Sequence, residues 1–558
     1  MVYKLRFLRR RFRRVFAAVV ALTLVVILVN CGGGPETATD VPSTAGADAP
    51  AETGTLVFGA VGQPVSLESG NITDGYSIDV QRQIYNYLLG HEPGTTELMP
   101  ELATEWGASE DGLVWTFTLR EGVTFHDGTE FNADAVVFNI NRWWDPEFEY
   151  GFRDAGKLYE GWIYLFGGFK GDEASILAEV RAVDDLTVEF ELSQPFAAFA
   201  AAIASGYFGI ASPTAVQTAG VDYGTPSSTA VGTGPFVFEE WRSGDRITLS
   251  KFDDYWEEGL PKVDRLVMSF VEDPAARLAQ LRTGTLDFTV NLNPDQLSEV
   301  ESDPNLEAVF RPSFNVGYLT LNPSYEPFAT AEVRRAVAQA INKAAIVEAF
   351  WGDLATTDGH FIPPSMADYT SEDVDDYEYD PEAAKAAIAA AGYPDGFELE
   401  LWYPAISGLA FPTPKPIAEA LAAELNQIGI TVTLQTKDWG AYLEDRNTPP
   451  GFQSYMIAWG GDYGDPDNFF YPNFSESSTQ DLGDYQNPEL EELLNQARFE
   501  PDAAKRQDLY KTIDGLLFDE ALRIPIVHAK PLLAKRVEVE GWVPSPLGSE
   551  AFTEVSKS

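Results

Sequence analysis

The residues best suited to chemistry in this chain are a short run of aspartates and four histidines. Asp462, Asp465 and Asp467 lie close together, but the run lacks the glycine and the distal glutamate of a calcium-binding EF-hand loop. The histidines lie far apart in the sequence, and none forms a pair with metal-ligand spacing: His91, His126, His360 and His528. We therefore expect no metal site and interpret the histidines as structural or surface residues.

Common enzyme motifs are missing from the sequence. It contains no GxSxG, HExxH, P-loop or CxxC pattern. Two carboxylates could act together as in a glycosidase, but sequence spacing cannot place them at the required separation. We expect a protein without enzymatic activity and without a cofactor.

The charge balance of the chain is strongly acidic. Its 558 residues include 86 Asp+Glu against 38 Lys+Arg, which gives a net charge of −48, and 45% are hydrophobic. This apolar fraction is sufficient for a folded core, which excludes a disordered acidic chain. Because so acidic a surface repels phosphate backbones, we expect a solvated surface and no nucleic-acid partner.

The single cysteine, Cys31, follows a segment typical of an export signal. A basic run from Lys4 to Arg14 precedes an apolar stretch at 15–29 that is too short for a membrane span. We expect residues 1–30 to be a signal peptide. The sequence LVNCGGG resembles the lipobox of bacterial lipoproteins, whose cysteine carries a lipid, although Asn30 replaces the usual small residue. An uncleaved signal anchor and an ordinary secreted chain are the alternatives.

The segment after the cysteine has low complexity. It is rich in Gly, Ala, Pro, Thr and acidic residues and contains no aromatic residue up to position 54. Such a composition is typical of a flexible tether. We expect residues 31–54 to comprise the lipidated cysteine and a linker to a folded body.

Strand and helix patterns alternate in that body. Apolar and polar residues alternate at 115–119 and 188–192, which predicts half-buried strands. Asp380 and Pro381 predict the start of a helix that ends before Gly392.

The order of helix and strand then repeats. A strand pattern at 397–401 follows the first helix, and a helical apolar face at 417–428 precedes another strand pattern at 430–434. This order predicts an α/β fold.

Several segments resemble the family 5 solute-binding proteins of bacterial ABC importers, closest to the dipeptide- and oligopeptide-binding branch. The resemblance covers roughly residues 55–555. The matching segments are IYNYL at 84–88 with the stretch up to residue 138, VGTGPF at 231–236, NVGYLTLN at 315–322, EVRRAVAQAINKAAIV at 332–347 and IPIVHAKPLLAKRVEVEGWVPSPLG at 524–548.

This resemblance implies a two-lobed, type II periplasmic-binding-protein-like clam-shell with an extra subdomain on the first lobe. Such lobes close on their ligand by a hinge motion. The implied boundaries are lobe I at 55–95, its extra subdomain at 96–224, lobe I again at 225–312, lobe II at 313–525 and a return to lobe I at 526–558.

The resemblance also implies a ligand site around the segment AWGGDYGDPDNFF at 458–470. In peptide-binding relatives, the aspartate at the position of Asp462 pairs with the α-ammonium group of the peptide, a charge-assisted contact. Gly460 and Gly461 would leave backbone groups free for strand-like pairing with a peptide, and Trp459 would form an apolar wall. Tyr403 and Tyr76 are further candidates for ligand contacts. A Gly/Asp-rich turn with a core tryptophan is the structural alternative.

One expected feature of dipeptide binders is missing. The resemblance expects an arginine for the peptide carboxylate and a tyrosine two residues later, but Gly408 and Ala410 stand at these positions. A glycine cannot replace a guanidinium clamp. Lys415, Lys437 or Arg446 could substitute. Otherwise the ligand is longer than a dipeptide, or it is another amine-bearing solute that is not a free dipeptide.

The implied function is that of a monomeric receptor that captures peptides and delivers them to ABC permease subunits. It would lie outside the cytoplasm, in the periplasm or anchored to the outer face of the cytoplasmic membrane. An oligosaccharide or a nickel chelate is the alternative cargo, and an extracytoplasmic hydrolase is the alternative from another class.

Overall fold

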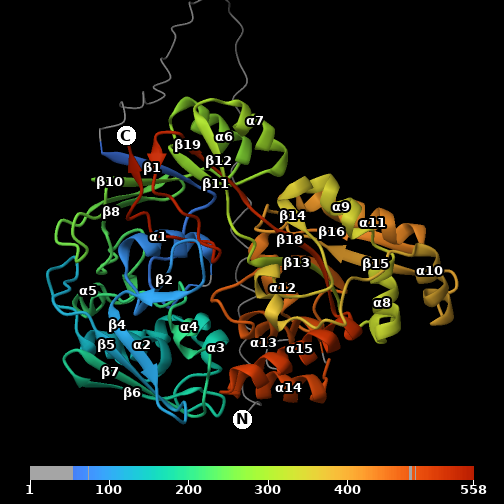
Figure 1. Cartoon of the computed structure of the whole chain (residues 1–558), viewed down its shortest axis with the longest axis horizontal. Coiled ribbons are helices and arrows are strands. Elements are labelled where there is room, and N and C mark those ends of the chain that lie inside the picture. Colours follow the sequence, from blue (N-terminus) through green and yellow to red (C-terminus); the bar gives the residue numbers. More distant parts are fainter. Residues whose placement is uncertain (1–53, 73, 477–479, 484) are drawn as a thin grey trace, which may run out of the picture. The chain divides into compact units, whose positions relative to one another are not determined.

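The structure is a computed structural model of the chain, and it describes residues 54–558 except 73, 477–479 and 484 (Figure 1). The predicted signal peptide, Cys31 and the predicted linker up to residue 53 lie outside the described residues. Among the helices of the described part, none is both long enough and apolar enough to cross a membrane.

A seven-stranded mixed sheet forms the core of the first lobe (Figure 1). Its central strand β1 (Thr55–Ala60) pairs in parallel with β10 and β11. In spatial order the sheet contains β12 (Leu306–Phe310), β19 (Leu532–Arg536), β11 (Phe288–Leu292), β1, β10 (Arg265–Phe270), β9 (Arg246–Lys251) and β8 (Phe236–Arg242). The same lobe contains the helices α1 (Gly75–Ile84), α5 (Pro213–Ala219), α6 (Pro274–Thr283) and α7 (Leu297–Ser302), and the short strands β20 (Val539–Glu540) and β21 (Ser556–Lys557).

The extra subdomain is built on a four-stranded antiparallel sheet. Its order is β4 (Ala103–Ala108), β5 (Val114–Leu119), β7 (Thr187–Leu192) and β6 (Leu177–Asp184). The strands predicted at 115–119 and 188–192 are confirmed as β5 and β7, and they pair with each other, with Phe117 opposite Val188. The other elements here are the hairpin β2 (Leu89–His91) and β3 (Leu98–Pro100) and the helices α2 (Ala133–Trp144), α3 (Glu160–Phe166) and α4 (Phe199–Ile203).

A six-stranded sheet forms the core of the second lobe. Its order is β14 (Ala355–Thr356), β18 (Arg523–Ala529), β13 (Asn315–Leu321), β17 (Ser454–Gly460), β15 (Phe397–Trp402) and β16 (Ile430–Gln435). The helices of this lobe are α8 (Ala331–Gln339), α9 (Lys343–Phe350), α10 (Pro381–Ala390), α11 (Pro414–Gln427), α12 (Trp439–Arg446), α13 (Asp467–Phe474), α14 (Pro488–Phe499) and α15 (Ala503–Glu520). Two sheets with associated helices confirm the predicted two-lobed α/β fold.

Local signals in the second lobe act as the sequence predicts. The Asp380 side chain accepts a hydrogen bond from the Ala383 amide and caps α10, which begins at Pro381. Gly392 follows this helix with a φ of 107°, a conformation that glycine adopts at little cost. The predicted strands at 397–401 and 430–434 are β15 and β16, which pair in parallel.

Short 3-10 helices connect several of these elements. They are η1 (Glu149–Gly151), η2 (Arg153–Ala155), η3 (Gly220–Asp222), η4 (Pro294–Gln296), η5 (Glu326–Phe328), η6 (Gly352–Leu354), η7 (Pro364–Tyr369) and η8 (Gln480–Leu482).

Two short segments cross between the lobes. One joins β12 to β13, and the other joins β18 to β19. Asn315 ties them together, because its Nδ2 donates to the Ala529 carbonyl at 2.8 Å and its Oδ1 accepts from the Ala529 amide at 3.0 Å. Strand β18 belongs to the second sheet up to Ala529, so the chain enters the first sheet again at Leu532, after the boundary at 526 that the sequence indicates. A few crossing residues of this kind can act as a hinge.

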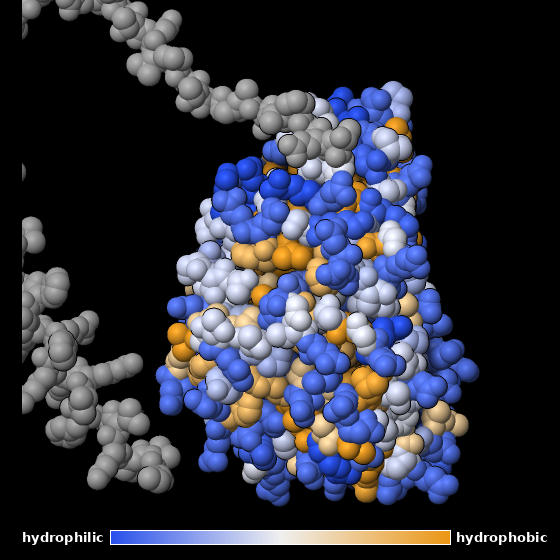
Figure 2. Space-filling view, turned by 90° about the vertical axis from the view of Figure 1, so that its left-hand side faces the viewer, coloured by the Kyte–Doolittle hydropathy of each residue, from blue (hydrophilic) through white to orange (hydrophobic). Residues whose placement is uncertain are grey.

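The face of the molecule seen in Figure 2 is mainly hydrophilic, with hydrophobic residues scattered over it. Such a surface fits the solvated exterior that the acidic composition predicts.

Candidate functional site

The candidate site begins where strand β17 ends. Gly460 is the last residue of β17 and lies opposite Asn315 of β13. The Gly461 amide donates to the Phe314 carbonyl at 3.1 Å, and a Cβ on Gly461 would lie 2.0 Å from the Phe314 ring. Glycine is therefore required at 461 by this close approach. The Gly461 N–H thus has a partner within the chain, whereas pairing of a peptide with the other backbone groups of Gly460 and Gly461 stays a prediction.

Asp462 follows as a half-buried carboxylate. It accepts a hydrogen bond from the Tyr207 hydroxyl at 2.8 Å and one from Asn468 Nδ2 at 3.1 Å, while its own amide donates to Asn468 Oδ1 at 2.7 Å. Burial raises the pKa of Asp462, and the hydrogen bonds from Asn468 and Tyr207 oppose this rise. The described residues provide no ion-pair partner for it, so both of its contacts come from neutral donors.

Tyr207 reaches Asp462 from the first lobe. It lies between α4 and α5 and belongs to the hydrophobic core of the extra subdomain. Burial raises the pKa of Tyr207 well above its ordinary value, and the negative charge of Asp462 adds to this rise. Tyr463, the neighbour of Asp462, packs into the same core of the extra subdomain. The loop after β17 is thus held between the two lobes.

The two other aspartates of the motif have arginine partners. Asp465 forms a two-point ion pair with Arg506, at 2.8 and 2.6 Å. Asp467 lies 3.6 Å from Arg498, whose Nη2 donates to the Leu165 carbonyl of α3 in the first lobe at 2.7 Å. These aspartates therefore position the loop, and Asp462 differs from them because neutral groups surround it.

The remaining predicted site residues lie in different surroundings. Trp459 is half-buried in β17, and its Nε1 is enclosed without a hydrogen-bond partner in the described part of the chain. Tyr403 packs against the core of the second lobe, and its amide donates to the Gln435 carbonyl. Tyr76 lies in the first turn of α1 with its ring beside Gly62, and it interacts electrostatically with Arg277 of α6.

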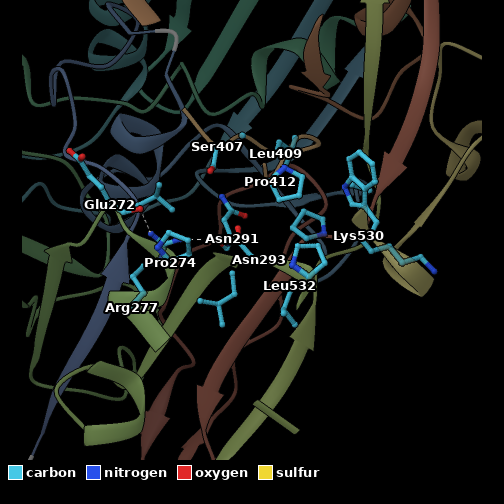
Figure 3. A pocket seen from close by; sticks show the side chains of 17 residues that line it. Glu272, Pro274, Arg277, Asn291, Asn293, Ser407, Leu409, Pro412, Lys530 and Leu532 are labelled. Carbon is cyan, nitrogen blue, oxygen red and sulfur yellow. Dashed lines mark hydrogen bonds between the residues drawn. The ribbon is translucent and has the colours of Figure 1, made fainter. Parts of the chain in front are cut away.

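A small cavity of about 40 Å³ lies where the two lobes adjoin (Figure 3). Residues of both lobes line it. The first lobe supplies Val61, Glu272, Pro274, Arg277 and the segment 291–294, the second supplies Trp351, 407–409 and Pro412, and the crossing segment supplies 529–532.

This cavity is connected to the Asp462 motif through Leu409. Leu409 lines the cavity, and its Cδ2 would lie 2.8 Å from a Cβ on Gly460. Gly408, which stands where the resemblance expects an arginine, also lines the cavity and has open space around its Cα. The structure therefore brings the two sequence motifs of the predicted site together.

The two lysines and the arginine considered as substitutes for the missing arginine have other partners. Lys415 is exposed on α11 and pairs with Glu419 at 3.8 Å, and Lys437 pairs with Asp445. Arg446 donates from Nε to Asn447 Oδ1 at 3.1 Å and lies over the Tyr455 ring. None of these three lines the cavity, whereas Arg277, which sequence reasoning missed, does.

Comparison with known proteins identifies the family to which the chain is similar. The family "Bacterial extracellular solute-binding proteins, family 5 Middle" matches residues 97–481. The dipeptide-binding protein of Escherichia coli (strain K12) is 35% identical over 515 residues, which cover 90% of this chain and 94% of that protein. Heme-binding protein A of Haemophilus influenzae is 34% identical over 514 residues, 90% of this chain and 92% of that protein.

A solved structure is similar over the same extent. It is the periplasmic binding protein DppA from Helicobacter pylori in complex with the peptide STSA, with a TM-score of 0.80, 28% sequence identity and coverage of 90% of this chain and 98% of that chain. Its similarity agrees with the two sheets and the extra subdomain described above. On the fold and on a match over more than half of its length, this chain belongs to the bacterial extracellular solute-binding proteins of family 5.

Proposed function

We propose that this protein is an extracytoplasmic receptor that captures short peptides between its lobes and delivers them to an ABC permease. The observation that carries this proposal is Asp462, a half-buried carboxylate at the junction of the lobes whose side-chain donors in the described part of the chain are neutral. The relatives named for dipeptide binding and for the peptide STSA support a peptide as the ligand.

The chemistry of Asp462 suits the amino end of a peptide. A carboxylate offers about four acceptor sites, and Tyr207 and Asn468 occupy two of them. An α-ammonium group would supply the missing positive charge and donate to the remaining sites. This contact would be strengthened in the closed form, because closure excludes water.

Lobe closure links capture to delivery. Tyr207 to Asp462 and Arg498 to Leu165 are contacts that join the two lobes. A ligand shifts the equilibrium toward the closed form only if it binds that form more tightly, which a ligand touching both lobes does. The permease would then recognise the closed form.

Trp459 and the tyrosines have secondary roles in this proposal. Trp459 would provide an apolar wall and a free Nε1 donor for a ligand acceptor. Tyr76 and Tyr403 are not among the residues that line the cavity, so they would contact only parts of the ligand that extend beyond it. Gly460 would allow Leu409 to approach.

Attachment to the membrane is part of the proposal. Cys31 would carry the lipid, and the following linker would allow the body to move beside the permease. Mass spectrometry of the mature protein purified from a bacterial host tests this directly, since lipidation adds a diacylglyceryl mass to a chain that begins at Cys31.

The ligand is tested on the protein as purified. Native mass spectrometry is expected to show retained peptides, and isothermal titration calorimetry with those peptides gives the affinity. Asp462→Asn removes the negative charge. It is expected to reduce the binding free energy of the peptide by on the order of 2–5 kcal/mol, which raises Kd roughly 30- to 5,000-fold. Asp380→Asn is the matched control, because Asn also caps a helix and α10 lies in the second lobe away from the cavity.

Three results would contradict the proposal. Retention of a sugar or a metal chelate in place of a peptide would assign another cargo. Unchanged peptide affinity in Asp462→Asn would remove its role. Release of hydrolysis products by the purified protein would assign an enzyme.

A further inference from the structure

Arg277 is a buried cation that forms no close ion pair within the described part of the chain. Its residue is 1% exposed, and the carboxylate whose charge acts on it, that of Asp273, lies beyond ion-pair distance. Burial lowers its pKa to about 10, so it remains positively charged at neutral pH. An arginine buried in this way is normally paired with an acid, because an isolated buried charge is costly.

Three of the five N–H donors of the Arg277 guanidinium have partners in the described part of the chain. Nη1 donates to the Val271 and Glu272 carbonyls at 2.6 and 2.8 Å, and Nη2 donates to the Asn291 carbonyl at 2.7 Å. A guanidinium has five N–H groups, so one on Nη2 and the one on Nε remain. Nε is buried and has no hydrogen-bond partner among residues 54–558 as far as the structure describes them. These two neighbouring donors match the geometry of a carboxylate.

The free donors belong to a residue that lines the cavity between the lobes. Figure 3 shows Arg277 on one side of the cavity and Ser407, Leu409 and Pro412 across from it. Two other charged residues line the cavity, but the Glu272 carboxylate and the Lys530 ammonium point away from the other labelled side chains. Arg277 is therefore the charge that a ligand in this cavity would meet.

The backbone beside Arg277 is also unusual. Asn291 has a φ of 52°, in the left-handed region, at an irregularity in the pairing of β11 with β19. This conformation presents the Asn291 carbonyl to Arg277. Strained backbone of this kind is frequent where a ligand is held.

We propose that Arg277 of the first lobe binds the terminal carboxylate of the peptide in the cavity beside Gly408. This inference rests on the proposed function and adds to it the group that recognises the second end of the ligand. The carboxylate clamp would lie on the opposite lobe from the position at which Gly408 lacks a side chain. A peptide held by Asp462 in one lobe and by Arg277 in the other would connect the lobes, so both of its charged ends would stabilise the closed form.

The test compares two probes on the purified protein. One is a random tripeptide library with free C-terminal carboxylates, and the other is the same library as C-terminal amides. Native mass spectrometry and thermal shift are expected to show at least a tenfold preference of the wild-type protein for the free acids. In Arg277→Met the preference is expected to fall below about threefold, and Arg277→Lys is expected to retain part of it.

Matched variants separate the carboxylate contact from a structural role. Arg282→Met removes a cation from the same helix, where it is paired with Glu299 and Asp303 at the surface, and is expected to leave the preference unchanged. Gly408→Asp adds a negative charge to the cavity from the opposite wall, at a position with open space, and is expected to reduce or reverse the preference. This second variant keeps the test decisive if Arg277→Met fails to fold.

Each outcome has one meaning. If neither library binds the wild-type protein, the proposed function fails and this inference fails with it. If acids and amides bind the wild-type protein equally, peptide capture stands and the carboxylate site is overturned. If Arg277→Met weakens both libraries by the same factor, Arg277 only supports the backbone and the inference is overturned.

Discussion

The Tyr207 hydroxyl donates a hydrogen bond to the Asp462 carboxylate at 2.8 Å, across 255 positions of the sequence. Tyr207 lies in the core of the extra subdomain, and Asp462 follows β17 of the second lobe. One hydrogen bond thus joins the lobes at the carboxylate proposed to bind the ligand. Without a ligand, the hydroxyl provides a neutral donor to a half-buried charge.

Removing this hydroxyl is expected to loosen the closed form. In Tyr207→Phe the Asp462 carboxylate would lose one of its two side-chain donors, and a hydrogen bond to a charged group is worth about 1.5–3 kcal/mol. A shift of roughly 10- to 150-fold toward the open form follows in the free protein. Small-angle X-ray scattering would detect it as a larger radius of gyration that a saturating ligand reverses.

Tyr87→Phe is the control for this prediction. The Tyr87 hydroxyl donates to the Gly206 carbonyl at 3.2 Å, and both residues belong to the first lobe. Its loss is expected to leave the scattering unchanged. Identical scattering of the two variants would mean that the bond from Tyr207 does not contribute to closure.

Local chemistry made much of the fold predictable. The capping aspartate and the proline that begin α10 act over neighbouring residues, and the alternation in β5 and β7 reflects one buried face. Such signals are contained within a few residues of sequence. The order of the strands in the two sheets depends on contacts between distant segments and could not be derived in this way.

The candidate site was predictable only in part. Asp462 stands in a recognisable motif, but Tyr207 and Arg277 lie in segments whose sequence gives no sign of binding. Their roles arise because the fold brings the first lobe against the loop after β17 and against the segment around Gly408. The sequence also does not show why position 461 requires glycine, because that requirement comes from the close approach of the Phe314 ring.

Ligand affinity is expected to depend on pH through Asp462. Its pKa is raised, so it takes up a proton at a higher pH than an aspartate with the ordinary value of 3.8. A peptide amine stays protonated below pH 7, and it binds the charged carboxylate. Affinity should therefore fall as the pH decreases from 7, with the loss beginning above the range of an ordinary aspartate.

Calorimetry between pH 7 and pH 4 measures this dependence. Asp462→Asn serves as the control, because it should bind weakly and with a flatter pH profile. An equally steep profile in Asp462→Asn would assign the dependence to another group.

Replacement by alanine is expected to lower the stability of the protein at Gly461 and to leave it nearly unchanged at Gly460. A Cβ on Gly461 would lie 2.0 Å from the ring of Phe314, which is 3% exposed and packs against Phe469 at 5.3 Å. Since this ring has little room to move, Gly461→Ala should cost about 1–3 kcal/mol of stability. A Cβ on Gly460 would meet only the end of the Leu409 side chain at 2.8 Å, which can rotate away.

Urea unfolding of both variants checks this difference. Gly460→Ala should unfold close to the wild-type midpoint and change ligand affinity instead, because Leu409 lines the cavity. Equal losses of stability in the two variants would show that the Phe314 ring moves aside as easily as the Leu409 side chain.

Gly408→Arg is expected to create a second carboxylate contact. A Cβ at Gly408 would have no atom within 4 Å, so the structure accommodates a side chain there without strain in the core. An arginine at this position would extend from the second lobe beside the cavity, where the resemblance places the clamp of dipeptide binders. A charge-assisted bond to the ligand contributes about 1.5–3 kcal/mol, so dipeptides with a free carboxylate should bind roughly 10- to 150-fold more tightly.

Calorimetry with a dipeptide and its C-terminal amide tests this gain, with Gly408→Gln as a control for side-chain length without charge. The companion tyrosine cannot be restored at Ala410, because that residue is fully buried and its carbonyl accepts a hydrogen bond from Trp351. A gain that is confined to the free acid and absent in Gly408→Gln would place the ligand carboxylate in this cavity. Weaker binding of both dipeptide and amide would instead mean that the open space beside Gly408 holds a side chain of the bound peptide, which the arginine displaces.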